Sequence, residues 1–212
     1  MLPELPHWAA NDTVVRIRPW HPDDIPAFLE ATDASRADLA RWMAWHHPNF
    51  GWRDAAGYVL SRPSAWSEQS EYSFAIIDLA DERILGDIAL NRVDAINRVA
   101  NIGYWIRSDA TGRGHASRAL RMIRTFAFRH LHLERLEIVA AVDNLPSRRV
   151  AERAGATLEG IMARRLRLHD EQLDAALYAL LPASRLRIES EPMSNPSTGN
   201  ESASSSRTSP AA

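Results

Sequence analysis

Two glycines, Gly112 and Gly114, interrupt the stretch NIGYWIRSDATGRGHA at residues 101–116. Because glycine has no side chain, the backbone amides of residues 112–116 could approach an anion closely. Apolar residues then recur at helical spacing over residues 117–130, and the positive end of that helix would favour the same anion. The pattern therefore indicates either a site for a phosphate-bearing ligand or an ordinary tight turn before a helix.

The elements that must position this turn alternate along the chain. An apolar, aromatic strand at residues 102–106 leads into the turn, and a nearly continuous apolar strand is predicted at residues 136–142. Gly86 predicts a bulge or a close backbone approach within its strand. Further strands are expected at residues 13–20, 71–78, 84–92, 157–168 and 173–181, and helices after residue 22 and at 35–45, 53–66, 117–131 and 146–153.

The composition suggests one domain and excludes several classes of protein. The 212-residue chain has no cysteine, which rules out disulfides, thiol nucleophiles and thiolate metal sites. Its formal net charge of -2 gives no basic surface for nonspecific nucleic-acid binding, and no apolar run reaches membrane-spanning length. With no signal segment, we expect a cytoplasmic protein that contacts neither nucleic acid nor membrane. We expect one domain over residues 13–182, an N-terminal extension at 1–12 and a disordered, serine- and proline-rich tail at 189–212.

Three motifs together resemble the core of GNAT acetyltransferases. They are GYWI at residues 103–106, TGRGHASRAL at 111–120 and LERLEIVAAVDNLPSRRVAERAGATLEG at 133–160. Within that superfamily the chain is most similar to the Rim-type ribosomal-protein N-alpha-acetyltransferases, over residues 14–181. The family's pyrophosphate loop has Gln or Arg at the position of Thr111, but the loop binds mainly through backbone amides.

The resemblance implies an α/β (α+β) GNAT fold, a mixed and mostly antiparallel twisted sheet flanked by helices, whose central strands splay apart around acetyl-CoA. It implies direct acetyl transfer to an amine, preferably the N-terminal amine of a protein or peptide, and a possible homodimer. A small-molecule amine acetyltransferase and a CoA-binding module without turnover are the alternatives. The residues it assigns to acetyl-CoA are Tyr104, Trp105, Ile106 and Arg107 along the pantetheine arm, Gly112, Arg113, Gly114, His115 and Ala116 at the pyrophosphate, and Asn144 at a pantetheine amide or as a helix cap.

Two residues are candidates for proton transfer. Rim-type enzymes use a motif serine to return a proton to the CoA thiolate, and that position is Ser147; the alternative is a helix N-terminal hydroxyl that satisfies a backbone amide. Some of these enzymes use a strand glutamate as the base, but Leu166 occupies its position here. Glu137, a carboxylate within an apolar strand, is the substitute candidate, unless it is edge-exposed or paired with an arginine.

Aromatic and imidazole side chains gather at residues 42–52, in a region where the resembled family forms its acceptor wall. They form either a substrate-facing surface or a core of tryptophans with solvated histidines. Adjacent histidines do not share a helix face, and no nearby carboxylate completes a ligand set, so no metal is expected. Asp87 and Glu71 are either acceptor-side carboxylates or solvated surface positions. The aromatic and imidazole residues are Trp42, Trp45, His46, His47, Phe50 and Trp52.

Overall fold

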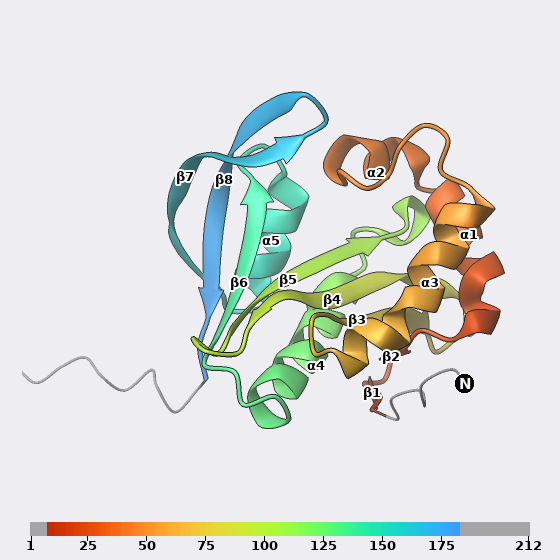
Figure 1. Cartoon of the computed structure of the whole chain (residues 1–212), viewed down its shortest axis with the longest axis horizontal. Coiled ribbons are helices and arrows are strands. Elements are labelled where there is room, and N and C mark those ends of the chain that lie inside the picture. Colours follow the sequence, from red (N-terminus) through yellow and green to blue (C-terminus); the bar gives the residue numbers. More distant parts are fainter. Residues whose placement is uncertain (1–7, 183–212) are drawn as a thin grey trace, which may run out of the picture.

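The computed structural model describes residues 8–182, and in this part of the chain eight strands form one sheet (Figure 1). Their order is β1-β2-β3-β4-β5-β6-β8-β7, and every neighbouring pair is antiparallel except β5 with β6. This mixed, mostly antiparallel sheet confirms the predicted fold class. The strands are β1 (Ala10–Asn11), β2 (Val15–Pro19), β3 (Tyr72–Asp78), β4 (Ile84–Asp94), β5 (Val99–Ile106), β6 (Arg135–Ala141), β7 (Thr157–Leu168) and β8 (Glu171–Leu180).

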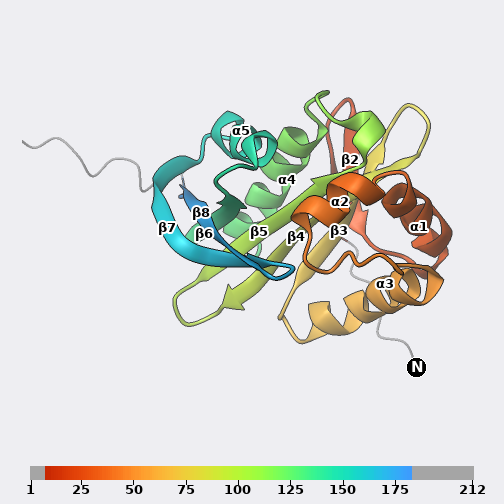
Figure 2. The ribbon, with the colours of Figure 1, turned by 90° about the horizontal axis from the view of Figure 1, so that it is seen from above.

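Helices cover both faces of the sheet (Figure 2). One face, called the α1–α3 face, carries α1 (Ile25–Asp33), α2 (Arg36–Trp42) and α3 (Trp52–Ser67). The opposite face, called the α4 face, carries α4 (His115–Arg129) and α5 (Leu145–Arg153). Short 3-10 turns at Pro22–Asp24 and Ser108–Ala110 precede α1 and α4. Among residues 8–182, no helix is long and apolar enough to cross a membrane.

The central strands are apolar on both sides because helices cover both faces. In β3, Phe74 and Ile76 belong to the core beneath α4, whereas Ala75 and Ile77 belong to a second core beneath α1 and α3. Successive side chains of a strand point to opposite faces, so one strand supplies both cores. This double coverage explains the near-continuous apolar runs in the sequence.

The strands β5 and β6 run together only from Val99 to Asn101 of β5. Beyond that point β5 continues along β4 as far as Ile106, while β6 continues along β8. The two central strands therefore splay apart, as predicted. Gly86 of β4 lies so close to β5 that an added Cβ would be 2.1 Å from the Trp105 carbonyl oxygen, which confirms the predicted close approach.

The described part of the expected N-terminal extension, residues 8–12, contacts the domain. β1 pairs with β2, and the Trp8 ring lies 5.3 Å from the ring of Phe74 and 4.6 Å from that of Phe126. This segment therefore covers one side of the core beneath α4. The predicted disordered tail, residues 189–212, lies outside the described residues.

Candidate active site

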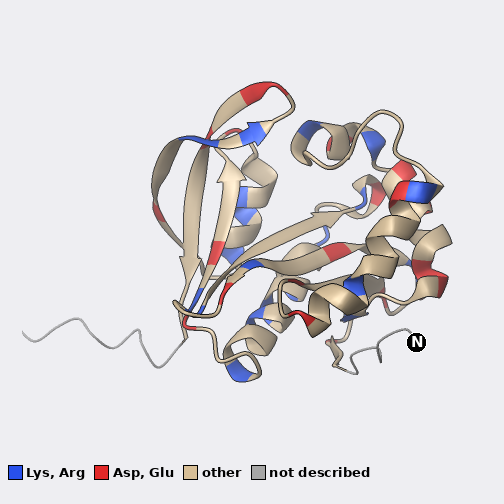
Figure 3. Ribbon diagram, viewed as in Figure 1, with Lys and Arg blue, Asp and Glu red and all other residues tan. Residues whose placement is uncertain are grey.

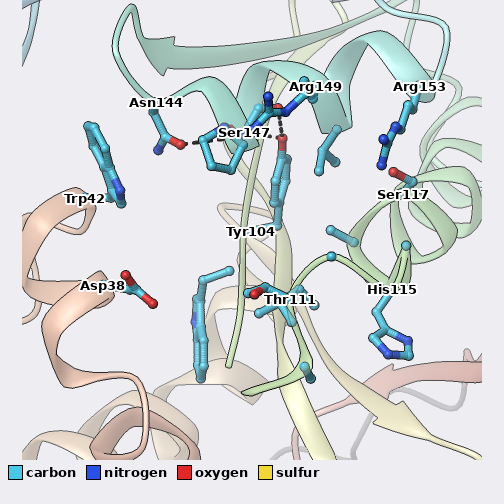
Figure 4. Close-up of a pocket in the computed structure, with 18 of the residues that line it drawn as sticks. Asp38, Trp42, Tyr104, Thr111, His115, Ser117, Asn144, Ser147, Arg149 and Arg153 are labelled. Atoms are coloured by element: carbon cyan, nitrogen blue, oxygen red, sulfur yellow. Dashed lines mark hydrogen bonds between the residues drawn. The ribbon is translucent and has the colours of Figure 1, made fainter. Parts of the chain in front are cut away.

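A cavity of about 610 Å³ lies where β5 and β6 separate (Figure 4). Tyr104 and Trp105 are consecutive strand residues that belong to opposite cores, so they line the cavity from the two faces of the sheet. The cavity is therefore bounded by elements from both the α4 face and the α1–α3 face. Its lining residues are Asp38, Leu39, Trp42, Met43, Tyr104, Trp105, Ile106, Ala110, Thr111, Gly112, Gly114, His115, Ala116, Ser117, Asn144, Pro146, Ser147, Arg149, Val150 and Arg153.

At one end of the cavity a glycine turn leads into α4. Gly112 and Gly114 have φ angles of 77° and 84°, in the left-handed region that other residues disfavour. Gly114 is the N-cap of the 15-residue helix and provides no side-chain cap, so the first amides lack a capping partner. Ser117 is 6% exposed, and its hydroxyl has no hydrogen-bond partner within residues 8–182. These donors at a positive helix end suit an anion such as a phosphate.

Two arginines of α5, Arg149 and Arg153, line the same cavity. Among the described residues neither guanidinium has an ion-pair or hydrogen-bond partner. Arg153 lies beside Ser117, across from the start of α4 (Figure 4), and basic positions recur along α5 (Figure 3). Neither arginine was predicted as a site residue, although their spacing of four places them on one side of a helix. They add positive charge where the glycine turn already favours an anion.

Tyr104 joins β5 to α5 in the middle of the cavity, between Trp42 and the start of α4 (Figure 4). Its hydroxyl lies 3.0 Å from Ser147 Oγ and donates to the Ser147 carbonyl oxygen at 2.9 Å. With the phenol proton on that carbonyl, the Ser147 hydroxyl donates to the phenol oxygen. Asn144 Oδ1 accepts from the Ser147 backbone N–H at 3.1 Å, so Asn144 caps α5 and the Ser147 hydroxyl is not needed as a cap. Burial raises the pKa of Tyr104, which keeps the phenol protonated.

The cavity combines a helix N-terminus suited to phosphate, two splayed strands and a serine hydroxyl. These features lie within a segment that matches a known family. Residues 15–157 match the acetyltransferase (GNAT) domain. The chain belongs to the GNAT family. This confirms the resemblance to GNAT acetyltransferases that the sequence motifs indicated.

Individual relatives of this GNAT domain are named for ribosomal proteins. The ribosomal-protein-serine acetyltransferase of Escherichia coli is 33% identical over 111 residues, which is 52% of this chain and 62% of the relative. YdaF of Bacillus subtilis is 41% identical over 103 residues, which is 49% of this chain and 56% of YdaF. The matched stretches thus span less than two thirds of these curated relatives.

Two solved GNAT structures share the fold and contain the coenzyme. RimL, a ribosomal L7/L12 alpha-N-protein acetyltransferase solved with coenzyme A, superposes with a TM-score of 0.75 at 25% identity, covering 80% of this chain and 95% of RimL. RimJ of Mycobacterium smegmatis, solved with a CoA disulfide, gives a TM-score of 0.72 at 27% identity, covering 82% and 84%.

Most of the residues predicted to bind the cofactor line the cavity of this GNAT domain, but two do not. Arg113 is not among the lining residues. The Arg107 side chain is 1% exposed and donates to both carboxylate oxygens of Glu30 and to Asp109, each at 2.7 Å. The Arg107 side chain therefore points away from the cavity, because these carboxylates hold its buried guanidinium, and the placement of the pantetheine arm along residues 104–107 stays a prediction. The predicted residues that line the cavity are Tyr104, Trp105, Ile106, Gly112, Gly114, His115, Ala116 and Asn144.

Glu137 does not have the environment that its prediction as a base requires. Arg135 Nε donates to Glu137 at 2.8 Å, and the same guanidinium binds Glu159 at 2.8 Å. Glu137 is absent from the cavity lining, and its side chain is 29% exposed. Of the two readings of Glu137, the structure therefore supports the carboxylate paired with an arginine. Leu166, at the position of the family glutamate, pairs with Leu173 of β8 and supplies no base.

Of the aromatic and imidazole residues at 42–52, only Trp42, the last residue of α2, lines the cavity. His46, expected in one alternative to be solvated, is 1% exposed and stacks on Phe50 with ring centroids 5.0 Å apart. Burial lowers the pKa of His46, so the ring is neutral. Trp45 and Trp52 are 43% and 53% exposed and so remain at the surface. Within residues 8–182, no three His, Asp or Glu side chains are grouped to hold a metal ion.

Asp87 is buried, which contradicts the solvated alternative. It is 5% exposed, and its Oδ1 accepts from Trp20 Nε1 at 2.7 Å and from Ser73 Oγ at 2.8 Å. Burial raises the pKa of Asp87 to about 6. Glu71, the other predicted carboxylate, is paired with Arg62 at 2.7 Å.

Proposed function

We propose that this protein transfers the acetyl group of acetyl-CoA to an amine. The observation that carries the proposal is one cavity at the splayed strands, with backbone amides suited to phosphate at one end and the Ser147 and Tyr104 hydroxyls in its middle (Figure 4). Acetyl-CoA has its groups in the same order, because the pantetheine arm separates its pyrophosphate from its thioester. The two superposable structures solved with CoA or its disulfide support this choice of donor.

Backbone groups of β5 provide a second part of the donor site. After Asn101, β6 no longer pairs with β5, so the edge of residues 104–106 that would face β6 has no strand partner. Unpaired backbone N–H and C=O groups in a cleft seek hydrogen bonds. The two amides of a pantetheine arm match them, in the manner of a peptide that adds to a sheet edge. The thioester then lies near Ser147.

The reaction on this surface is a direct transfer. The neutral amine nitrogen attacks the thioester carbon, the carbon–sulfur bond breaks, and the sulfur takes a proton as the amine loses one. Ser147 is the proposed donor to sulfur, because its Oγ shares a hydrogen bond with Tyr104 and is not used as a cap. Tyr104, kept protonated by burial, can replace the proton that Ser147 gives.

The proposed acceptor is the N-terminal amine of a protein, in line with the ribosomal-protein names of the relatives. An α-amine has a pKa near 8, about two units below that of a lysine side chain, so more of it is neutral at physiological pH. Deprotonation of an α-amine therefore needs a weaker base than deprotonation of a lysine side chain.

A mass-spectrometric experiment tests both donor and acceptor. The protein is mixed with acetyl-CoA and a peptide that has one free α-amine and one lysine, or with the same peptide blocked at its N-terminus. We expect acetylation at the α-amine only and none on the blocked peptide. Acetylation of the lysine in both peptides would contradict the α-amine assignment.

A further inference from the structure

Asp87 on β4 is a carboxylate that the packing of the sheet does not require. Its Oδ1 accepts the two hydrogen bonds from Trp20 and Ser73, and the Tyr58 hydroxyl lies 2.9 Å from Ser73 Oγ. Its Oδ2 has no hydrogen-bond partner among the described residues. Burying a carboxylate costs free energy that an apolar residue would not. The half-satisfied group therefore calls for a functional explanation.

Asp87 is not itself a lining residue of the cavity, but the register of the sheet places it next to one that is. Asp87 pairs with Trp105 in the antiparallel β4–β5 ladder, so both side chains project from the same face at adjacent positions. Trp105 lines the cavity from the α1–α3 face. The glycine turn and α5 occupy the α4 face, where the donor binds in the proposed function. An acceptor must then reach the thioester from the α1–α3 face, on which Asp87 lies.

Among the described residues, the other carboxylates considered as the base are already engaged or exposed. Glu137 is paired with Arg135, and Asp38, which lines the cavity, is exposed and accepts from Ser108. Leu166 occupies the position at which some related enzymes have a glutamate base. Asp87 alone among these carboxylates combines burial with an oxygen that no described residue engages.

We propose that Asp87 is the proton acceptor for the amine, through one intervening water molecule. The proposal rests on the proposed acetyl transfer. As the nitrogen forms its bond to the acetyl carbon, its N–H bond breaks and the proton passes to the water, which gives one of its own protons to Asp87 Oδ2. The proton leaves to solvent after the acetylated product departs, while the sulfur is protonated separately from Ser147.

The surroundings of Asp87 suit this role. The groups that face it are Tyr58 and Arg62 of α3, Glu71 before β3, Ser73 of β3 and Trp20. Burial raises the pKa of Asp87 and the charge of Glu71 adds to this, whereas the hydrogen bonds and Arg62 lower it, with a result of about 6. A base with a pKa near the working pH is ionised yet accepts a proton readily.

The test is the pH dependence of kcat, measured from pH 5 to 9 with saturating acetyl-CoA and peptide. We expect the wild type to lose rate below about pH 6 and Asp87→Asn, which is nearly isosteric, to lose about 100-fold in kcat together with that acid limb. Ser73→Ala removes a hydrogen bond to the charged form of Asp87. It should therefore shift the acid side of the pH–rate profile to higher pH, by about half a pH unit to one pH unit. Asp23→Asn, at a side chain 90% exposed, is the charge-matched control and should behave as wild type.

Three outcomes would overturn the assignment. One is Asp87→Asn with kcat within about twofold of wild type. Another is an Asp87→Asn profile that keeps the acid limb, because a purely structural role would leave the limb in place. If Asp87→Asn does not fold, as judged by circular dichroism, an unshifted limb in Ser73→Ala decides against the proposal. A wild type that transfers no acetyl group contradicts the proposed function itself, and the role of Asp87 falls with it.

Discussion

The buried carboxylate of Asp87 should make stability depend on pH. Its pKa is raised from 3.8 in the unfolded chain to about 6 in the native state, so the native state binds more protons between these values. The free energy of unfolding therefore falls as pH rises through this window, by up to about 3 kcal/mol from this one group.

Urea denaturation of wild type and Asp87→Asn between pH 4 and 7.5 measures this effect. Asparagine keeps an oxygen acceptor for Trp20 and Ser73 but carries no charge, so the variant should gain stability relative to wild type as pH rises. A constant difference between the two proteins across this range would show that Asp87 does not titrate as expected.

Ser147 can be tested apart from the helix that carries it. Asn144 caps α5 through the Ser147 backbone N–H, so Ser147→Ala removes the hydroxyl without removing the cap. We expect kcat to fall by about 10- to 100-fold while the Kd for acetyl-CoA changes less than about twofold. Steady-state kinetics and calorimetry supply the two numbers. Equal losses in kcat and affinity would mean that the hydroxyl serves binding and not proton transfer.

At the scale of elements, the glycine turn should depend on its backbone conformation. An added Cβ at Gly114 or at Gly57 meets no atom within 4 Å, but only Gly114 has a positive φ, of 84°. Gly114→Ala should cost about 1–2 kcal/mol and weaken acetyl-CoA binding, because the amides turn away from the anion. Gly57→Ala, in the middle of α3, should stabilise by about 0.5–1 kcal/mol and leave binding unchanged.

Urea denaturation and calorimetry of both glycine variants provide the comparison. Normal acetyl-CoA affinity in Gly114→Ala would contradict the use of this turn as an anion site.

The arginines of α5 should provide the salt-dependent part of donor binding. The two guanidinium groups have no acidic partner among residues 8–182, so they are free to meet the phosphates of acetyl-CoA. Arg149→Gln and Arg153→Gln should each raise the Kd several-fold at low salt and flatten its dependence on ionic strength. Arg121→Gln on the exposed side of α4 changes the net charge equally and is the control. An equal effect in the control would assign the change to overall charge.

At the scale of the whole molecule, the fold could be predicted because patterns of burial repeat along the chain. The strand expected at residues 136–142 is β6, Arg135–Ala141, and the helix expected at 146–153 is α5, Leu145–Arg153. Both faces of the central strands are covered, which gives apolar runs that are easily read. The motifs around Ser147 and the glycine turn then led to the site.

The residues that were mispredicted or missed share one physical cause, which is that tertiary contacts decide which way a side chain faces. Alternation shows neither which face of the sheet carries Asp87 nor that α3 covers it, because both depend on tertiary packing and strand register. Arg107 follows a cavity-lining strand residue, yet Glu30, distant in sequence, draws its side chain inward. His46 likewise depends on packing against Phe50.

The most direct test of acetyl transfer at the splayed strands is thiol release from acetyl-CoA, measured beside calorimetric acetyl-CoA binding. The acceptor panel contains N-terminal peptides, polyamines and amino-sugar antibiotics. We predict saturable acetyl-CoA binding and thiol release that requires a free peptide α-amine. Absence of binding would contradict the phosphate role of the glycine turn, and binding without thiol release on any amine would contradict the assignment of this cavity as an acetyl-transfer site.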